Sequence, residues 1–130
     1  MFDRLKKHHL GFVIAVEDRP RIESHFNKVF TYDHVQGTHV LFIYDKIGKI
    51  YVEYICREGR VKYHEPGFAH ICYTVKSNAE LEQVEQFIHD KKMGFKLTDL
   101  EQSGSEECNH VKFYYLKHLG VIELNLVPME

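Results

Sequence analysis

The sequence predicts an α+β fold in which two βαβββ modules form a single domain over residues 1–130. Three observations lead to this prediction. The chain has 130 residues, of which 44% are hydrophobic, and this suits one compact domain or two small modules that share a core. The order strand, helix and three strands occurs twice, in residues 6–60 and 66–128. Histidine and glutamate recur at matching strand positions of the two repeats.

The first module is predicted from hydrophobic periodicity and turn signals. Residues 9–16, HLGFVIAV, are typical of a strand. Asp18 is a candidate N-cap, and Pro20 follows it at the start of a predicted amphipathic helix over residues 19–30. The apolar side of this helix is expected to hold Ile22, Phe26, Val29 and Phe30. Three strands are predicted next, at residues 32–36, 38–45 and 49–56, with a hairpin turn at residues 46–48.

The second module repeats this order. Residues 69–75, AHICYTV, predict a strand. Ser77 and Glu80 form a candidate capping box for a helix that ends near Gly94. Its apolar side is expected to hold Leu81, Val84, Phe87 and Ile88. A short strand in residues 94–99 and a hairpin of residues 110–116 and 120–126 complete the module.

Composition and charge exclude several classes of protein. The formal net charge is −2, with acidic and basic residues interspersed, and this disfavours nucleic-acid binding. The N-terminus lacks the apolar segment of a signal peptide, and no run reaches the roughly 18 apolar residues of a membrane span. The three cysteines include no C-x-x-C pair, and Cys56 and Cys72 are expected to be core thiols. We therefore expect a reduced, cytoplasmic protein without a membrane partner.

Two glutamates lie inside apolar strands. Glu53 is in YVEYI and Glu123 is in VIELN, and an unpaired buried carboxylate costs several kcal/mol of solvation free energy. His9 and His70 open the first strand of each repeat. Taken singly, each glutamate could face solvent and each histidine could be a core residue. The recurrence of both in two repeats instead favours one divalent metal ion bound by all four side chains.

The donor set and the strand pattern narrow this hypothesis. Two imidazoles and two carboxylates suit zinc, cobalt, nickel, manganese or iron, and the identity of the metal stays open. His8 competes with His9 for the first ligand position. Because neighbouring side chains of a strand point to opposite faces, only one of them is expected to point inward. His9 is preferred because HLG matches the HIC sequence around His70.

These residues resemble the motifs of the vicinal oxygen chelate superfamily, also known as the glyoxalase–bleomycin-resistance fold. The motifs are HxG at residues 9–11, the strand Glu53, HIxY at residues 70–73 and GVIEL at residues 120–124, and the similarity extends over residues 6–127. The resemblance implies that the modules curl into an open-barrel sheet around the metal ion. It also implies a homodimer.

Within that superfamily, AHICYTV and GVIEL are most similar to motifs of methylmalonyl-CoA epimerases, although Ala69 replaces the first histidine of that family's pair. This implies proton transfer next to a carbonyl in a small-molecule substrate, such as an acyl-CoA or another acyl thioester. Glu123 is the expected catalytic base and Glu53 the second candidate. Asp33 or His34 could contribute from the loop YDHVQG.

Other members of the superfamily supply the alternatives. A glutathione-dependent glyoxalase, which is a lyase, needs the same four ligands. A ring-cleaving dioxygenase would use His9, His70 and Glu123 on iron, but Glu53 would then occupy an open position. A binding or resistance protein would use the cavity without chemistry.

Overall fold

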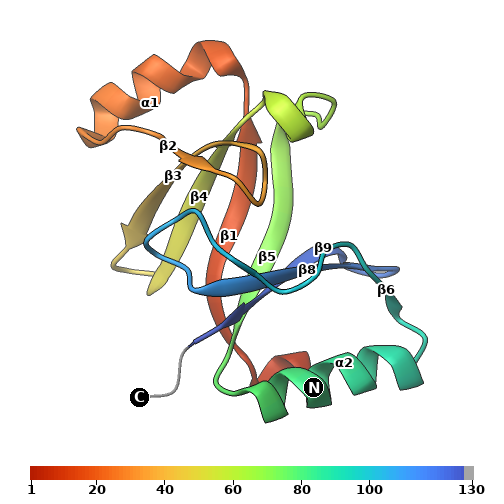
Figure 1. The fold of residues 1–130 in the computed structure, drawn as a ribbon. Helices are drawn as coiled ribbons and strands as arrows, with labels where there is room; N and C mark the ends of the chain where they lie inside the picture. Colours follow the sequence, from red (N-terminus) through yellow and green to blue (C-terminus); the bar gives the residue numbers. More distant parts are fainter. Residues whose placement is uncertain (128–130) are drawn as a thin grey trace.

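The computed structural model describes residues 1–127, and the predicted end of the second module at residue 128 lies outside them. Within these residues, nine strands form one open, curved sheet, and two α-helices flank it (Figure 1). The first half contains β1 (Lys6–Ile14), α1 (Arg19–Phe26), β2 (Thr31–Asp33), β3 (Thr38–Asp45) and β4 (Ile50–Cys56). The second half contains β5 (Gly67–Val75), α2 (Asn78–Asp90), β6 (Gly94–Lys96), β7 (Glu101–Gln102), β8 (His110–Leu116) and β9 (Gly120–Leu126). The predicted α+β fold with a curved open sheet is confirmed.

The two halves share one strand arrangement, except that the second half has an additional short strand, β7, which the sequence did not predict. The sheet order is β2-β3-β4-β1-β5-β9-β8-β6, with β7 on β8. β1 is parallel to β4 and β5 is parallel to β9, whereas β1 and β5 pair antiparallel and join the halves. In Figure 1, β8 and β9 run across the direction of β1 and β5, so the sheet curves. The four central strands are therefore β4, β1, β5 and β9.

Side chains alternate between the two faces of this sheet. On the outer face, α2 packs Leu81, Val84 and Ile88 against β5, β8 and β9, and α1 packs Ile22 and Phe26 against the first half. The inner face carries a separate apolar cluster that consists of Val13, Val35, Val40, Phe42, Ile55, Cys108, Val111 and Phe113. Because the sheet curves around this cluster, inward-facing polar residues of the central strands are enclosed.

The first helix is shorter than predicted. It ends at Phe26, because Asn27 takes the left-handed conformation (φ 52°), which asparagine tolerates well. Val29 is consequently exposed, whereas Phe30 is buried although it also lies after the end of the helix. Asp18 occupies the N-cap position, as predicted, but its side chain makes no capping hydrogen bond. It is the last residue of a 3₁₀ turn (Val16–Asp18), and its carboxylate accepts a hydrogen bond from Arg21 instead.

The second helix starts as predicted but ends earlier. Ser77 accepts a hydrogen bond from the Glu80 backbone N–H, whereas the Glu80 carboxylate bonds the Lys76 N–H and not that of Ser77. Gly94 does not cap the helix. The chain reverses at Lys92 (φ 51°), and Gly94 begins β6, where an added Cβ would lie 1.8 Å from the Tyr115 carbonyl oxygen. No helix in residues 1–127 is both long and apolar enough to cross a membrane.

Candidate metal centre

The central strands bring His9, Glu53, His70 and Glu123 together on the inner face; these are the four-residue cluster. Two adjacent rows of the sheet supply them. One row runs Tyr51, His9, Cys72 and Glu123 across β4, β1, β5 and β9. The next row on that face runs Glu53, Gly11, His70 and Val121. Each row thus contributes one histidine and one glutamate.

The donor atoms of the four-residue cluster converge on one point. Nε2 of His9 lies 3.0 Å from Nε2 of His70, 3.2 Å from Oε1 of Glu53 and 2.9 Å from Oε1 of Glu123. Nε2 of His70 lies 3.2 and 3.0 Å from the same two oxygens. All four side chains are at least 95% buried. These atoms form a compact set enclosed by the protein.

Gly11 makes this convergence possible. It lies between Glu53 and His70 in its row, and the His70 ring occupies the space above it. A Cβ at residue 11 would lie 2.5 Å from Cε1 of that ring. Only glycine therefore leaves room for His70 to reach across β1 toward His9.

The cluster fits a divalent metal ion. Oε1 of Glu53 and Oε1 of Glu123 are buried, and no hydrogen bond from residues 1–127 satisfies either of them. The imidazole nitrogens are near these oxygens, but no ring N–H is aimed at them. The two Nε2 atoms lie 2.9–3.2 Å from these oxygens, so one ion could be held by all four side chains. A mixed imidazole and carboxylate set suits zinc and its first-row neighbours.

The charges of the cluster depend on one another. Burial alone would lower the pKa of His70, but the carboxylates of Glu123 and Glu53 outweigh it and raise the pKa to about 10. Burial likewise opposes ionisation of Glu123, yet the charges of His9 and His70 hold its pKa below the usual range. The pKa of Glu53 is lowered in the same way, since burial is outweighed by His70 and His9. Both carboxylates are therefore ionised near neutral pH.

No protein-family model matches this chain, and neither does any curated protein. Solved structures do match it. Methylmalonyl-CoA epimerase from Mycobacterium tuberculosis superposes with a TM-score of 0.66 over 95% of this chain and 89% of that one, at 13% identity. A variant of the Streptomyces coelicolor epimerase, in complex with 2-nitronate-propionyl-CoA, gives 0.63 at 18% identity over 96% and 99%. The 2,2',3-trihydroxybiphenyl 1,2-dioxygenase from Sphingomonas wittichii gives 0.63 at 16% identity over 93% and 42%.

The chain has the vicinal oxygen chelate fold. The likeness extends over nearly the whole chain, but the low identities mean that it concerns the fold alone. Within this fold the seam between β1 and β5 lies at the centre of the sheet, and the four-residue cluster spans that seam.

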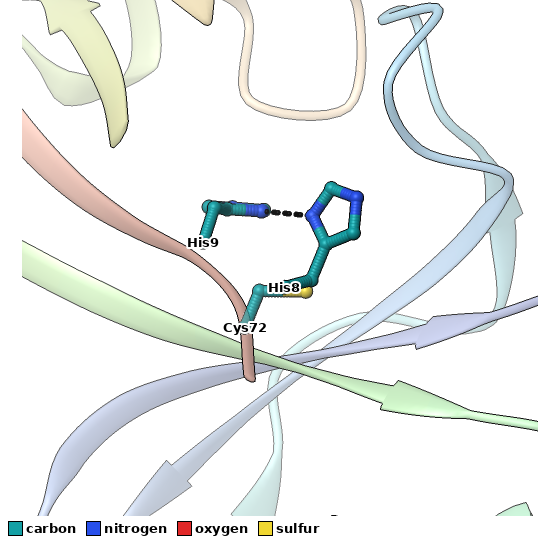
Figure 2. Close-up of side chains that lie close together, drawn as sticks. All are labelled: His8, His9 and Cys72. Carbon is teal, nitrogen blue, oxygen red and sulfur yellow. Dashed lines mark hydrogen bonds between the residues drawn. The ribbon is translucent and has the colours of Figure 1, made fainter. Parts of the chain in front are cut away.

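His8 does not point away from His9, so the expectation of opposite faces was wrong. Between Lys7 and His9, β1 advances by two residues while β5 advances by one, from Tyr73 to Cys72. This β-bulge leaves His8 unpaired and turns it beside His9, with their Nδ1 atoms 2.8 Å apart (Figure 2). Burial and the nearby charge of His9 both lower the pKa of His8.

Cys72 is the third member of the group in Figure 2. Burial raises the pKa of its thiol well above the usual value, and its Sγ donates to the Tyr73 carbonyl oxygen at 3.8 Å. Cys56 and Cys72 are fully buried and free, as expected for core thiols.

Gln36 contacts the four-residue cluster, and the sequence did not indicate this contact. Its Nε2 donates to Oε2 of Glu53 at 2.8 Å and to Oδ2 of Asp33 at 2.9 Å. Asp33 is itself buried and accepts hydrogen bonds from the backbone N–H groups of Val35 and Gly104. Asp33 thus supports Glu53 through Gln36, whereas His34 is exposed. No spacing rule singles out this glutamine, because the loop shape alone brings it to Glu53.

A cavity of about 440 Å³ adjoins the cluster at His70 and Gln36. Its walls are mostly apolar, and Arg60 and His64 lie at its exposed side. The apolar lining residues are Val13, Val35, Ile55, Val61, Ala69, Leu97, Phe113 and Val121. A small organic molecule that enters this cavity would reach the four-residue cluster along the His70 side.

Proposed function

We propose that this protein is a divalent-metal-dependent enzyme that moves a proton next to a carbonyl, as methylmalonyl-CoA epimerases do. One observation carries the proposal: four buried donor atoms converge beside an apolar cavity, and two of them are carboxylate oxygens without a hydrogen bond. His9, Glu53, His70 and Glu123 would hold the ion. A divalent ion bound there would polarise a substrate carbonyl and stabilise negative charge on its oxygen.

The two glutamates differ in how firmly hydrogen bonds hold their carboxylates, and this difference assigns them different roles. Oε2 of Glu53 is held by Gln36, and Asp33 holds Gln36 in turn. Among residues 1–127, no such side-chain donor holds the carboxylate of Glu123, and its buried Oε1 has no hydrogen bond, so this carboxylate is the freer one. We therefore assign Glu123 as the base that removes and returns the α-proton, and Glu53 as a fixed ligand.

The volume and the mostly apolar lining of the cavity suit a substrate with a small acyl group. Its apolar walls would exclude water from that group, and Arg60 is available to the anionic carrier at the exposed side. Arg60 is anchored by a hydrogen bond from Nη1 to the Val35 carbonyl oxygen. The complex of the Streptomyces coelicolor epimerase variant with 2-nitronate-propionyl-CoA makes an acyl-CoA the first substrate to test.

The first experiment measures the metal content of the purified, untagged protein beside Glu53→Ala and Glu123→Ala. Glu101→Ala is the matched control, because Glu101 is exposed on β7. We expect about one divalent ion per chain in the parent and control, lost in both cluster variants. If the parent binds no zinc, cobalt, nickel or manganese, the protein is instead a metal-free binding protein of this fold.

The second experiment follows α-proton exchange of methylmalonyl-CoA in heavy water by NMR. The parent should exchange the proton, and Glu123→Gln should keep metal but exchange it about 10²–10⁴-fold more slowly. Unchanged exchange in Glu123→Gln would remove Glu123 as the base. Turnover only of the hemithioacetal of glutathione and methylglyoxal would replace the epimerase by a glyoxalase-type lyase.

A further inference from the structure

The two histidines of the four-residue cluster have different neighbours, although the repeats place them alike. Each histidine is preceded by an unpaired residue, at a place where the β1–β5 pairing is irregular. In β1 the extra residue is His8, and in β5 the pairing skips Ala69 between Phe68 and His70. Both irregularities turn the preceding side chain toward the inner face. His9 thus has a polar neighbour where His70 has a methyl group that lines the cavity.

The His8 contact is to the ring nitrogen of His9 that the cluster leaves unused. Nε2 of His9 faces His70, Glu53 and Glu123, whereas Nδ1 lies 2.8 Å from Nδ1 of His8 (Figure 2). A metal ion bound through Nε2 requires the lone pair of that nitrogen, so the proton must be on Nδ1. Nδ1 of His8 is the acceptor in line with it.

The His8 ring is itself held in one orientation. It stacks on Tyr51 with a centroid distance of 5.2 Å and an angle of 23° between the rings. Tyr51 is paired with His9 in the β1–β4 register and packs against Phe42 and Tyr44. The His8 and His9 rings are nearly perpendicular, at 80°. A half-buried imidazole is thus clamped so that its acceptor nitrogen meets His9.

We propose that His8 is a positioning residue that accepts a hydrogen bond from Nδ1–H of His9 and so presents the Nε2 lone pair of His9 to the metal ion. Histidine ligands of metals usually donate this bond to a carboxylate, a backbone carbonyl or water. Here a second imidazole, delivered by a β-bulge, fills that role. This inference rests on the metal-binding part of the proposed function.

Two substitutions separate the hydrogen bond from the packing of His8. His8→Phe keeps the stacking on Tyr51 and removes the acceptor, whereas His8→Asp supplies a carboxylate acceptor without an aromatic ring. His89→Phe is the matched control, because His89 is exposed on α2. Cobalt affinity would be measured by competition with a chelator. The zinc-loaded protein would give long-range ¹H–¹⁵N spectra that report which nitrogen of His9 carries the proton.

We expect His8→Phe to bind one cobalt ion about 10–100-fold more weakly than the parent, and His8→Asp to recover most of that loss. The parent spectrum should show the His9 proton on Nδ1, in slow exchange, and in His8→Phe it should exchange rapidly. Equal cobalt affinity in the parent and His8→Phe would overturn the role of His8 and leave the metal site standing. Two ions per chain, with one lost in His8→Phe, would overturn it in favour of a second metal site at His8 and Cys72. A parent that binds no ion would overturn the proposed function itself.

Discussion

Gly11 decides whether the His70 ring can enter the cluster. In its row Gly11 separates Glu53 from His70, and the ring fills the space where a side chain would stand. Cys72 has the corresponding position between His9 and Glu123 in the other row. In each row one small residue thus separates the two ligands, which allows large side chains from both rows to meet at one point.

Gly11→Ala should weaken cobalt binding by about 10–100-fold, since the added methyl group displaces His70. Overpacking of this buried position should also lower the free energy of unfolding by about 1–3 kcal/mol. Chelator competition and urea unfolding measure the two effects. In the control Gly48→Ala, the methyl group would meet the movable carboxylate of Asp45 in an exposed turn and reach ordinary van der Waals distance from Ile50, so both values should stay near the parent. Parental metal affinity in Gly11→Ala would contradict the position assigned to His70.

At the level of elements, the ends of the helices and the bulges in the strands matter more than their centres. α1 ends at Phe26 rather than residue 30, because the left-handed residue Asn27 ends the hydrogen-bond pattern. The bulge at His8 breaks strict alternation in β1 and moves a side chain from the outer to the inner face. Periodicity describes the interior of an element well, but these local exceptions depend on the neighbouring strand.

α2 is tied to β8 by Glu85, which accepts hydrogen bonds from Lys112 (2.5 Å) and from the Tyr114 hydroxyl. Burial alone would raise the pKa of Glu85, but Lys112 and Tyr114 outweigh it and lower the pKa. A lowered carboxyl pKa stabilises the fold at pH values above the pKa of the unfolded state, 4.5. This contribution is lost as the pH falls through the pKa of the folded state.

Glu85→Gln should therefore have a lower free energy of unfolding than the parent at pH 7. The difference should be only about 0.5–1 kcal/mol, because solvent partly screens the contact. The difference should stay constant down to about pH 5 and shrink at lower pH. Urea unfolding at several pH values measures it. Glu82→Gln, at an exposed position of the same helix, should match the parent throughout. A difference for Glu85→Gln that persists at pH 3 would show that packing, and not charge, carries the effect.

At the scale of the whole molecule, the curved sheet ends in β2 and β6, and both outer edges are unpaired within residues 1–127. The β6 edge exposes Phe95, which is 59% exposed and packs on Tyr115 with ring centroids 5.5 Å apart. Unpaired edges with exposed aromatic side chains favour association. The homodimer implied by the resemblance is therefore still our prediction.

Light scattering should give a mass near twice the 15.4 kDa of one chain. Phe95→Lys should lower that mass toward one chain, because a charge at the β6 edge opposes pairing. Ile47→Lys, in the exposed β3–β4 turn, should leave the parental mass unchanged. A parent mass of a single chain would make the dimer prediction wrong.

The sequence by itself determined the α+β class, the repeated strand order apart from the additional strand β7, and the four residues that meet. Alternation and repetition are properties of the chain, and an apolar strand with a matching glutamate in each repeat can be recognised without coordinates. It also placed the N-terminal cap of α2 at Ser77, because that bond lies within one turn of helix.

Only the tertiary structure decided how the surroundings of the four-residue cluster are built. The bulge at His8 arises from the pairing of β1 with β5, which are far apart in the chain. Gln36 reaches Glu53 because a loop folds over β4, and Gly11 matters because His70 arrives from another strand. These contacts join segments that share no local periodicity, so their partners become known only when the sheet closes around them.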